Sequence, residues 1–230
     1  MTDLTIVMPV LNEENTLGQA IREVVDAAPA EGSLELIIVD DGSTDGSPAI
    51  IEEAVESDPR VRVITHPVNR GKGSAIVTGL REAGGRWSAI MDADLEYEVA
   101  DIDRILEPLR RGDADAVFGA RGFDAGSAYS FWYVVGNRGV TLFASLLFDS
   151  WLRDIMTCHK VMATDVFRSL DLTENGFAIE AEITARLLRK GKRIYEVPVS
   201  YRARSREEGK KLTVLDGFRV LRTLIRCRFS

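Results

Sequence analysis

Cysteine is scarce in this chain of 230 residues, which contains only Cys158 and Cys227. Their spacing matches no metal-binding pattern and indicates a reducing compartment, so we expect both to be packing residues. Long apolar runs are also missing: no stretch of about 18 apolar residues without charge occurs, and no membrane-spanning helix is expected. The apolar run at residues 6–11 is too short for a signal peptide. These absences predict a cytoplasmic protein.

Two glycine-rich nucleotide motifs are absent as well. The chain has no Gly-x-Gly-x-x-Gly string and no Gly-Lys-Ser/Thr string. Neither a dinucleotide-binding fold nor a phosphate-loop ATPase is therefore indicated.

Charge is unevenly distributed along the chain, whose formal net charge is −7. The segment from Arg186 to the end carries 14 basic and 4 acidic residues, whereas the remainder carries 15 basic and 32 acidic residues. The basic segment is either a solvated tail or a cationic face for phosphates or an anionic membrane surface.

Hydrophobic patterning predicts an α/β fold with a mostly parallel central sheet flanked by helices. Apolar runs typical of buried strands cover residues 4–10, 34–39, 61–65, 87–91 and 115–119. Segments with helical spacing lie between them, at residues 15–28, 47–56 and 74–83. Strands that alternate with helices in this way form parallel sheets through right-handed crossovers.

The second half of the chain is less regular. Residues 129–151 are rich in aromatic and aliphatic side chains, but Gly136 and its two polar neighbours interrupt the stretch, so we expect it not to span a bilayer. Residues 179–189 have helical spacing, and residues 193–199 are expected to form a strand. Residues 212–229 predict a basic amphipathic C-terminal helix, which either packs on the core with its arginines in water or lies on a membrane surface.

Two aspartates, Asp92 and Asp94, follow the predicted strand at residues 87–91. On an extended chain, residues two apart point the same way, so both carboxylates would meet at the carboxyl end of this strand. Open α/β sheets bind ligands at that edge, and paired carboxylates suit a hard divalent cation that also holds substrate phosphates. The alternative is a solvated turn after a strand.

Three further polar loops follow predicted strands, at residues 9–14, 39–46 and 69–73. Each loop alone could be a turn, and the Asp, Ser and Thr residues of the second loop are types that often cap the start of a helix. Their carboxylates could accept hydrogen bonds from a nucleobase or ribose, and Lys72, between two glycines, could approach a phosphate. Four polar loops at one edge of a parallel sheet therefore predict a nucleotide site.

These loops and several later strings carry a resemblance to a known family. The matching strings are residues 7–14, 39–46, 69–73, 91–96, 157–161, 180–184, 196–202 and 208–211. The chain resembles the family-2 glycosyltransferases of GT-A fold, and within them the branch that transfers a sugar from a nucleotide to dolichyl or polyprenyl phosphate. The resemblance spans nearly the whole chain.

The resemblance implies roles for particular residues. The residues implied to bind the nucleotide-sugar are Pro9, Val10, Asn12, Glu13, Asp41, Lys72, Asp92, Ala93 and Asp94. Asp94 and Glu96 are implied as ligands of Mg²⁺ or Mn²⁺, with Asp92 on the ribose or a metal-bound water. Arg121, Arg202 and Lys210 would face donor or acceptor phosphates, and with Asp92 and Asp94 they form the implied catalytic set.

One glycosyltransferase domain is implied over residues 1–230, with a nucleotide-binding half at 1–120 and an acceptor-binding half with membrane-facing helices at 121–230. Four positions depart from the family pattern, and we expect these departures to alter the acceptor pocket. They are His159 in place of tyrosine, Val99 in place of proline, and Ala178 and Ala181 in place of glycine and proline.

The expected reaction is an inverting, metal-dependent transfer from a UDP- or GDP-sugar to a polyprenyl phosphate. Such a phosphate has a second pKa of about 6 and is already a nucleophile at neutral pH. A hydroxyl acceptor on a polysaccharide or small metabolite would instead need a base, for which Asp154 and Glu180 are candidates. The chain lacks the Gln-x-x-Arg-Trp string of processive polysaccharide synthases. A non-catalytic nucleotide-binding module is disfavoured by the intact acidic set.

A polyprenyl-phosphate acceptor would bring the protein to a membrane. We expect peripheral association with an anionic surface through residues 129–151 and 212–229, or binding to a membrane-spanning partner, and no nucleic-acid partner. The sugar and the base are not specified by the sequence.

Overall fold

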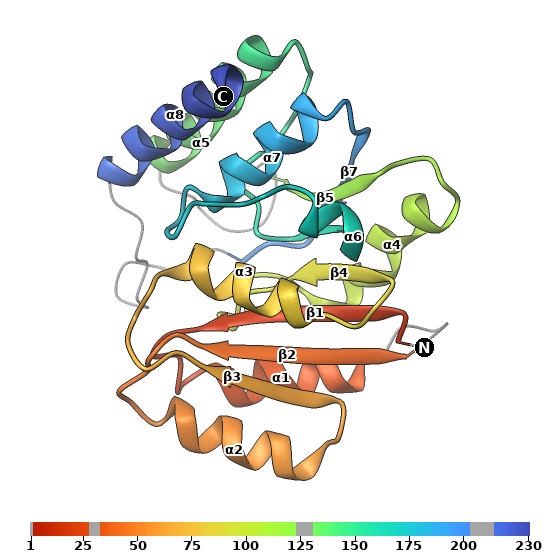
Figure 1. Ribbon diagram of the computed structural model, residues 1–230, viewed down its shortest axis with the longest axis vertical. Helices are drawn as coiled ribbons and strands as arrows, with labels where there is room; N and C mark the ends of the chain where they lie inside the picture. Colours follow the sequence, from red (N-terminus) through yellow and green to blue (C-terminus); the bar gives the residue numbers. More distant parts are fainter. Residues whose placement is uncertain (1, 28–32, 123–130, 203–213) are drawn as a thin grey trace.

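The computed structural model describes residues 2–27, 33–122, 131–202 and 214–230, and a seven-stranded sheet of order β3-β2-β1-β4-β6-β5-β7 runs through it (Figure 1). The strands are β1 (Leu4–Val10), β2 (Leu34–Asp40), β3 (Val61–Thr65), β4 (Trp87–Ile90), β5 (Ala116–Arg121), β6 (Lys160–Ala163) and β7 (Ile194–Val199). Strand β6 is antiparallel to β4 and β5, and the other neighbours are parallel. The sheet is mostly parallel, which confirms the predicted α/β fold.

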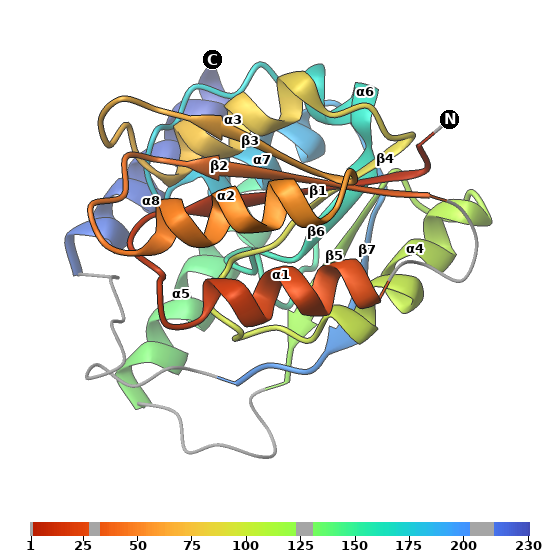
Figure 2. The same cartoon turned by 90° about the horizontal axis from the view of Figure 1, so that it is seen from below.

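Helices cover both faces of the sheet (Figure 2). One face carries α1 (Leu17–Asp26), α2 (Ser47–Ser57), the short η1 (Val99–Asp101) and α4 (Ile102–Arg110), and the other carries α3 (Lys72–Glu82), α6 (Thr164–Arg168) and α7 (Ile179–Arg189). In β1, Ile6 and Met8 belong to the first apolar cluster and Val7 to the second, as the period of two requires. Burial of both faces explains why the strands read as continuous apolar runs.

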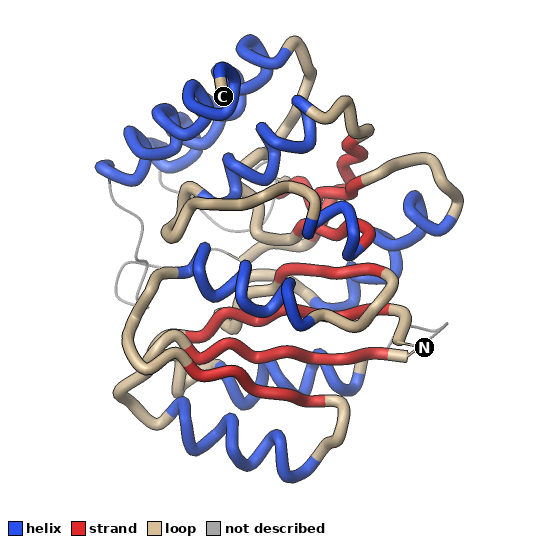
Figure 3. Tube along the Cα trace, in the orientation of Figure 1, coloured by secondary structure: helices blue, strands red, loops and turns tan. Residues whose placement is uncertain are grey.

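A third apolar cluster joins α7 to α5 (Phe131–Phe148) and α8 (Val214–Phe229), which lie side by side outside the sheet (Figures 1 and 3). Val220, Leu224 and Cys227 of α8 are buried in this cluster. The C-terminal helix therefore packs on the core through one side, as one of the two interpretations predicted.

Helix α5 differs from the sequence-based expectation, because it runs for 18 residues without a break at Gly136. The polar residue beside that glycine, Asn137, is buried and donates a hydrogen bond to Asp154, so it has a place inside the fold. By length and composition alone, α5 is the one helix in the described ranges that could cross a membrane. The expectation that the chain has no membrane-spanning helix stays a prediction.

Candidate functional site

A cavity of about 730 Å³ opens at the carboxyl ends of β1, β2 and β4. Part of the lining comes from the loops that follow these strands and from the start of α3, and the rest comes from β5, α5, residues 173–180 and α8. The predicted site residues on its lining are Pro9, Val10, Glu13, Asp41, Lys72, Asp92, Ala93, Asp94, Glu96 and Arg121. The polar loops therefore converge at one edge, as the parallel topology predicts.

Asn12 does not line this cavity, although it was predicted to bind the nucleotide. Its backbone N–H donates to Ser43 Oγ at 3.0 Å, and its side-chain oxygen accepts from the Thr44 N–H at 2.8 Å. Its positive φ of 54° suits asparagine, which tolerates left-handed backbone better than most residues. Asn12 therefore clamps the loop after β1 to the loop after β2.

Asp41 is buried and holds the loop that leads into α3. Its two carboxylate oxygens accept the N–H groups of Arg70 at 2.9 Å and Gly71 at 2.7 Å. The same carboxylate shares a hydrogen bond with His66 Nδ1 at 2.6 Å. Asp41 lines the cavity, and these contacts make it a fixed part of the wall.

The glycines around Lys72 serve a close approach of two backbones. The Asn175 carbonyl accepts from the Gly73 N–H at 2.8 Å and from the Ser74 N–H at 3.3 Å, which caps the start of α3. A Cβ at Gly73 would collide with the Glu174 carbonyl oxygen. Gly71 also has a φ of 95°, a conformation that favours glycine. The sequence-based interpretation, that these glycines bring Lys72 to a phosphate, missed this contact.

Lys72 reaches into a buried row of charges. Its Nζ lies 2.7 Å from Asp92 Oδ2 and 3.6 Å from Glu180 Oε1. The other oxygen of Glu180 accepts from the fully buried Lys160 Nζ at 2.9 Å. Burial works against the charge on Lys72, but attraction to Asp92 and Glu180 outweighs it and raises the pKa of the lysine well above its ordinary value. Carboxylates and ammonium groups therefore alternate along this row, in which Asp92, Lys72 and Glu180 line the cavity and Lys160 lies behind it.

The acidic motif lies in a turn beyond β4, because that strand ends at Ile90. The extended-chain argument therefore does not describe Asp92 and Asp94, although both line the cavity. Asp94 Oδ1 accepts from the Glu96 N–H at 3.1 Å, and Leu95 between them has a φ of 58°.

No group of three or more His, Cys, Asp or Glu side chains in the described ranges is arranged to hold a metal ion. The donors that do face the cavity are carboxylate oxygens, and Mg²⁺ binds through one or two carboxylates together with substrate phosphates. The donor set therefore fits a divalent cation shared with a diphosphate, and does not form a cage for a permanently bound ion.

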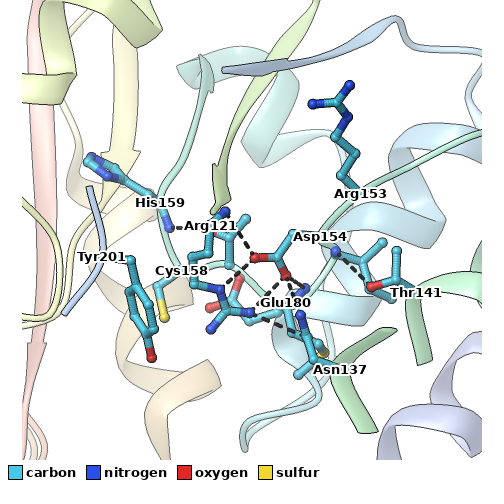
Figure 4. Close-up of polar contacts among 12 residues, drawn as sticks. Arg121, Asn137, Thr141, Arg153, Asp154, Cys158, His159, Glu180 and Tyr201 are labelled. Atoms are coloured by element: carbon cyan, nitrogen blue, oxygen red, sulfur yellow. Dashed lines mark hydrogen bonds and ion pairs between the residues drawn. The ribbon is translucent and has the colours of Figure 1, made fainter. Parts of the chain in front are cut away.

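Arg121 lies on the cavity wall, but its guanidinium is occupied (Figure 4). It donates to Asp154 at 2.5 and 2.8 Å, and to the Tyr133 hydroxyl at 2.8 Å. Burial opposes ionisation of Asp154, but Arg121 outweighs it and lowers the pKa of this carboxyl. The neighbouring Arg153 points away from this pair (Figure 4). Arg121 therefore acts as an anchor between β5 and the residues after α5.

Of the two remaining predicted basic residues, Arg202 does not line the cavity. Arg202 is exposed, and its backbone N–H donates to the Glu96 carbonyl at 2.8 Å. Lys210 lies outside the described residues. Arg202 therefore holds the acidic loop through its backbone N–H. That its side chain faces a donor or acceptor phosphate stays a prediction.

Three tyrosines were missed by the sequence analysis. Tyr97, Tyr133 and Tyr201 line the cavity, and the Tyr201 hydroxyl donates to Glu96 Oε2 at 2.8 Å. Tyr201 stands next to Arg202 in a string that carries the family resemblance, so the signal was present. Its aromatic ring packs under Arg121, 5.0 Å from the guanidinium carbon.

Helix α8 also contributes to the cavity, which was not predicted. Arg219 and Arg226 line it, and Arg226 lies 2.6 Å from Glu174 Oε1. Thr223 donates to the same oxygen at 2.8 Å. The arginines of α8 were expected in water, on a cationic face for phosphates or on a membrane surface, and two of them line the cavity.

His159, where the family has tyrosine, is buried against Tyr97 with ring centroids 5.4 Å apart. Neither ring nitrogen has a hydrogen-bond partner among the described residues. Burial lowers the pKa of this histidine to about 4, so it is neutral at physiological pH.

Comparisons with known proteins agree with this architecture. The chain is 30% identical over 220 residues to an undecaprenyl-phosphate mannosyltransferase of Micrococcus luteus, which covers 91% of this chain and 87% of that protein. It is 28% identical over 225 residues to the low-salt glycan biosynthesis hexosyltransferase Agl6 of Haloferax volcanii, and spans 53% of that protein's length.

A similar solved structure is glucosyl-3-phosphoglycerate synthase from Mycobacterium tuberculosis in complex with Mn²⁺, UDP and phosphoglyceric acid. The TM-score is 0.75 at 20% identity, with 99% of this chain and 79% of that chain covered, which establishes the shared fold alone. The family model for glycosyl transferase family 2 matches residues 5–170. Because this family model matches most of the chain and the fold agrees, the chain belongs to glycosyl transferase family 2.

Proposed function

We propose that this chain transfers a hexose from a nucleoside diphosphate sugar to a polyprenyl phosphate, with inversion at the anomeric carbon. Support comes from the mannosyltransferase relative, named for an undecaprenyl phosphate, and from the cavity that joins an acidic loop to a basic helix. The sugar and the nucleotide base are left open.

The donor half of the proposal assigns roles to the strand-end loops. Pro9, Val10 and Glu13 would form the wall against the nucleoside, which the fixed carboxylate of Asp41 completes. A Mg²⁺ or Mn²⁺ ion held by Asp94 and Glu96, with Asp92 beside them, would neutralise charge on the departing nucleoside diphosphate. Tyr201 would keep Glu96 oriented through its hydroxyl.

The choice of acceptor is carried by one observation: both carboxylates proposed as bases for a hydroxyl acceptor are held by cations. Asp154 is paired with Arg121, and Glu180 faces the ammonium groups of Lys160 and Lys72. A phosphate monoester needs no base at neutral pH, because its second pKa is about 6. It does need cations, and Arg219 and Arg226 line the cavity, where they pair with Asp216 and Glu174.

The route to a lipid acceptor would run along α5 and α8. Each helix presents an exposed apolar stripe with one exposed arginine within it. The stripe residues are Phe131, Val135, Leu142 and Leu146 with Arg138 on α5, and Leu215, Phe218, Ile225 and Phe229 with Arg222 on α8. We propose that these two stripes dock peripherally on an anionic membrane at its cytoplasmic side.

The test is a transfer assay with a matched pair of acceptors. Donors are UDP-glucose, UDP-N-acetylglucosamine, GDP-mannose and dTDP-sugars with Mn²⁺, and acceptors are a polyprenyl phosphate and the corresponding polyprenol. We expect transfer to the phosphate and none to the alcohol. Transfer to a free sugar or metabolite hydroxyl, with none to the phosphate, would replace this proposal by the hydroxyl-acceptor reaction.

A further inference from the structure

The Lys72 ammonium lies between two carboxylates and is closer to one of them than to the other. Its Nζ is 2.7 Å from Asp92 Oδ2 and 3.6 Å from Glu180 Oε1. The first distance is a charge-assisted hydrogen bond, and the second is an ion pair without a hydrogen bond. The ammonium therefore donates to Asp92 and, at 3.1 Å, to the Cys158 sulfur, and a second carboxylate lies within reach.

Glu180 is incompletely satisfied on the side that faces Lys72. Its Oε2 accepts from Lys160, whereas its buried Oε1 has no hydrogen-bond partner among the described residues. A buried polar atom without a partner is uncommon in folded proteins and calls for a reason. Glu180 also lines the cavity, so this oxygen belongs to the site.

We infer that Lys72 is a stand-in cation: it neutralises Asp92 while no metal is bound, and its ammonium transfers to Glu180 Oε1 when a divalent metal ion binds. This inference rests on the proposed metal site at Asp94 and Glu96. The physical reason is repulsion, because a divalent cation beside Asp92 and an ammonium on the same carboxylate disfavour each other at short range. The unsatisfied oxygen of Glu180 gives the displaced ammonium a hydrogen bond.

The exchange would keep a cation beside Asp92 and a cation beside Glu180 in both states. Without metal, Lys72 compensates Asp92 and Lys160 compensates Glu180. With metal, the divalent ion compensates the acidic motif, and both lysines would share Glu180, each on its own oxygen.

The test measures binding of Mn²⁺ alone, from the loss of the free-ion electron paramagnetic resonance signal, so it is independent of turnover. Lys72→Met should increase Mn²⁺ affinity about tenfold, because a competing cation is removed. Glu180→Gln should decrease it about tenfold, because Lys72 then loses its second acceptor. Controls are Lys192→Met, beside Asp115, and Glu35→Gln, which is held by Arg62 and Thr5; neither residue lines the cavity.

The double variant separates a switch from simple charge effects. If Glu180 acts through Lys72, adding Glu180→Gln to Lys72→Met should change Mn²⁺ affinity less than twofold. Equal effects of Glu180→Gln with and without Lys72 would overturn the inference.

A crystal structure of the wild type with Mn²⁺ and UDP tests the same transfer without any variant. Lys72 Nζ should be within hydrogen-bond distance of Glu180 Oε1 and no longer on Asp92. An ammonium still bonded to Asp92 beside the metal would overturn the switch alone. A wild type that binds no Mn²⁺, with or without UDP, would overturn the metal site and the switch together.

Discussion

Replacing Asp154 by asparagine should strongly destabilise the protein, because it removes the carboxylate that pairs with the buried Arg121 guanidinium. The side chains of Arg121 and Asp154 are 5% and 1% exposed and meet through two hydrogen bonds of 2.5 and 2.8 Å. Removing one partner of such a buried pair costs about 3–5 kcal/mol. For a chain of this size each kcal/mol lowers the melting temperature by about 2–4 °C, so we expect a fall of about 6–20 °C.

Circular dichroism during heating and urea titration measures this loss. The matched control is Asp113→Asn, because Asp113 pairs with Arg111 at 2.9 Å on the surface, where both side chains are more than half exposed. That change should cost under about 1 kcal/mol. Replacing the buried pair together, with Arg121→Met and Asp154→Leu, should recover part of the stability. An Asp154→Asn variant that melts like the wild type but has lost transfer would refute the anchor role and favour a phosphate-binding Arg121.

Four other outcomes are expected. Asp94→Ala should reduce transfer about a hundredfold or more and make nucleotide affinity insensitive to Mn²⁺ in calorimetry, whereas wild-type rates with saturating donor would exclude Asp94 as a metal ligand. Arg202→Ala should reduce transfer while UDP or GDP affinity changes little, and a collapse of that affinity would move Arg202 to the donor side. Phe218→Glu should weaken co-sedimentation with anionic liposomes, and Arg222→Glu should reduce its salt dependence, since the screening length is about 10 Å at 0.1 M; a wild type that stays in the supernatant at low salt would contradict the docking surface. Burial lowers the pKa of His159 to about 4, so the unfolded chain binds a proton on this ring at a higher pH than the folded chain does. The free energy of unfolding should therefore fall by up to about 3 kcal/mol as the pH decreases from about 6.5 through 4. Urea titrations of His159→Phe should lack this pH-dependent loss, and a variant with the same pH profile as the wild type would exclude His159 as its source.

Strands β1, β2, β4 and β5 were predicted from continuous apolar runs, because these strands are buried on both faces. Strand β6 escaped prediction because it has four residues and begins with Lys160, a charged side chain with no exposed surface. Its burial is possible because Glu180 and two backbone carbonyls, those of Ile155 and Thr157, accept its protons. Hydrophobic periodicity carries no information about such a pairing.

The site was predictable where it depends on topology and less so where it depends on partners. Val10, Asp41 and Asp92 line the cavity because the carboxyl ends of parallel strands share one edge. What neutralises each charge is set by residues distant in the sequence, such as Asp154 for Arg121. The sequence therefore identified well which residues face the cavity. It identified less well which of these residues are available to bind a ligand, and their catalytic roles stay predictions.

The contact of Arg226 with Glu174 matters for anyone who recombines members of this family. Glu174 and Asn175 form one wall of the cavity, and the Asn175 carbonyl caps α3 beside Lys72. A chimaera joined near residue 120 would replace this wall and the helix that braces it while keeping the rest of the donor loops. In such a hybrid the two parts of the donor pocket come from different proteins and should not fit each other. The preference for a donor sugar would then depend on both parent sequences. Exchanging residues 171–178 and α8 along with the donor loops would keep the pocket whole.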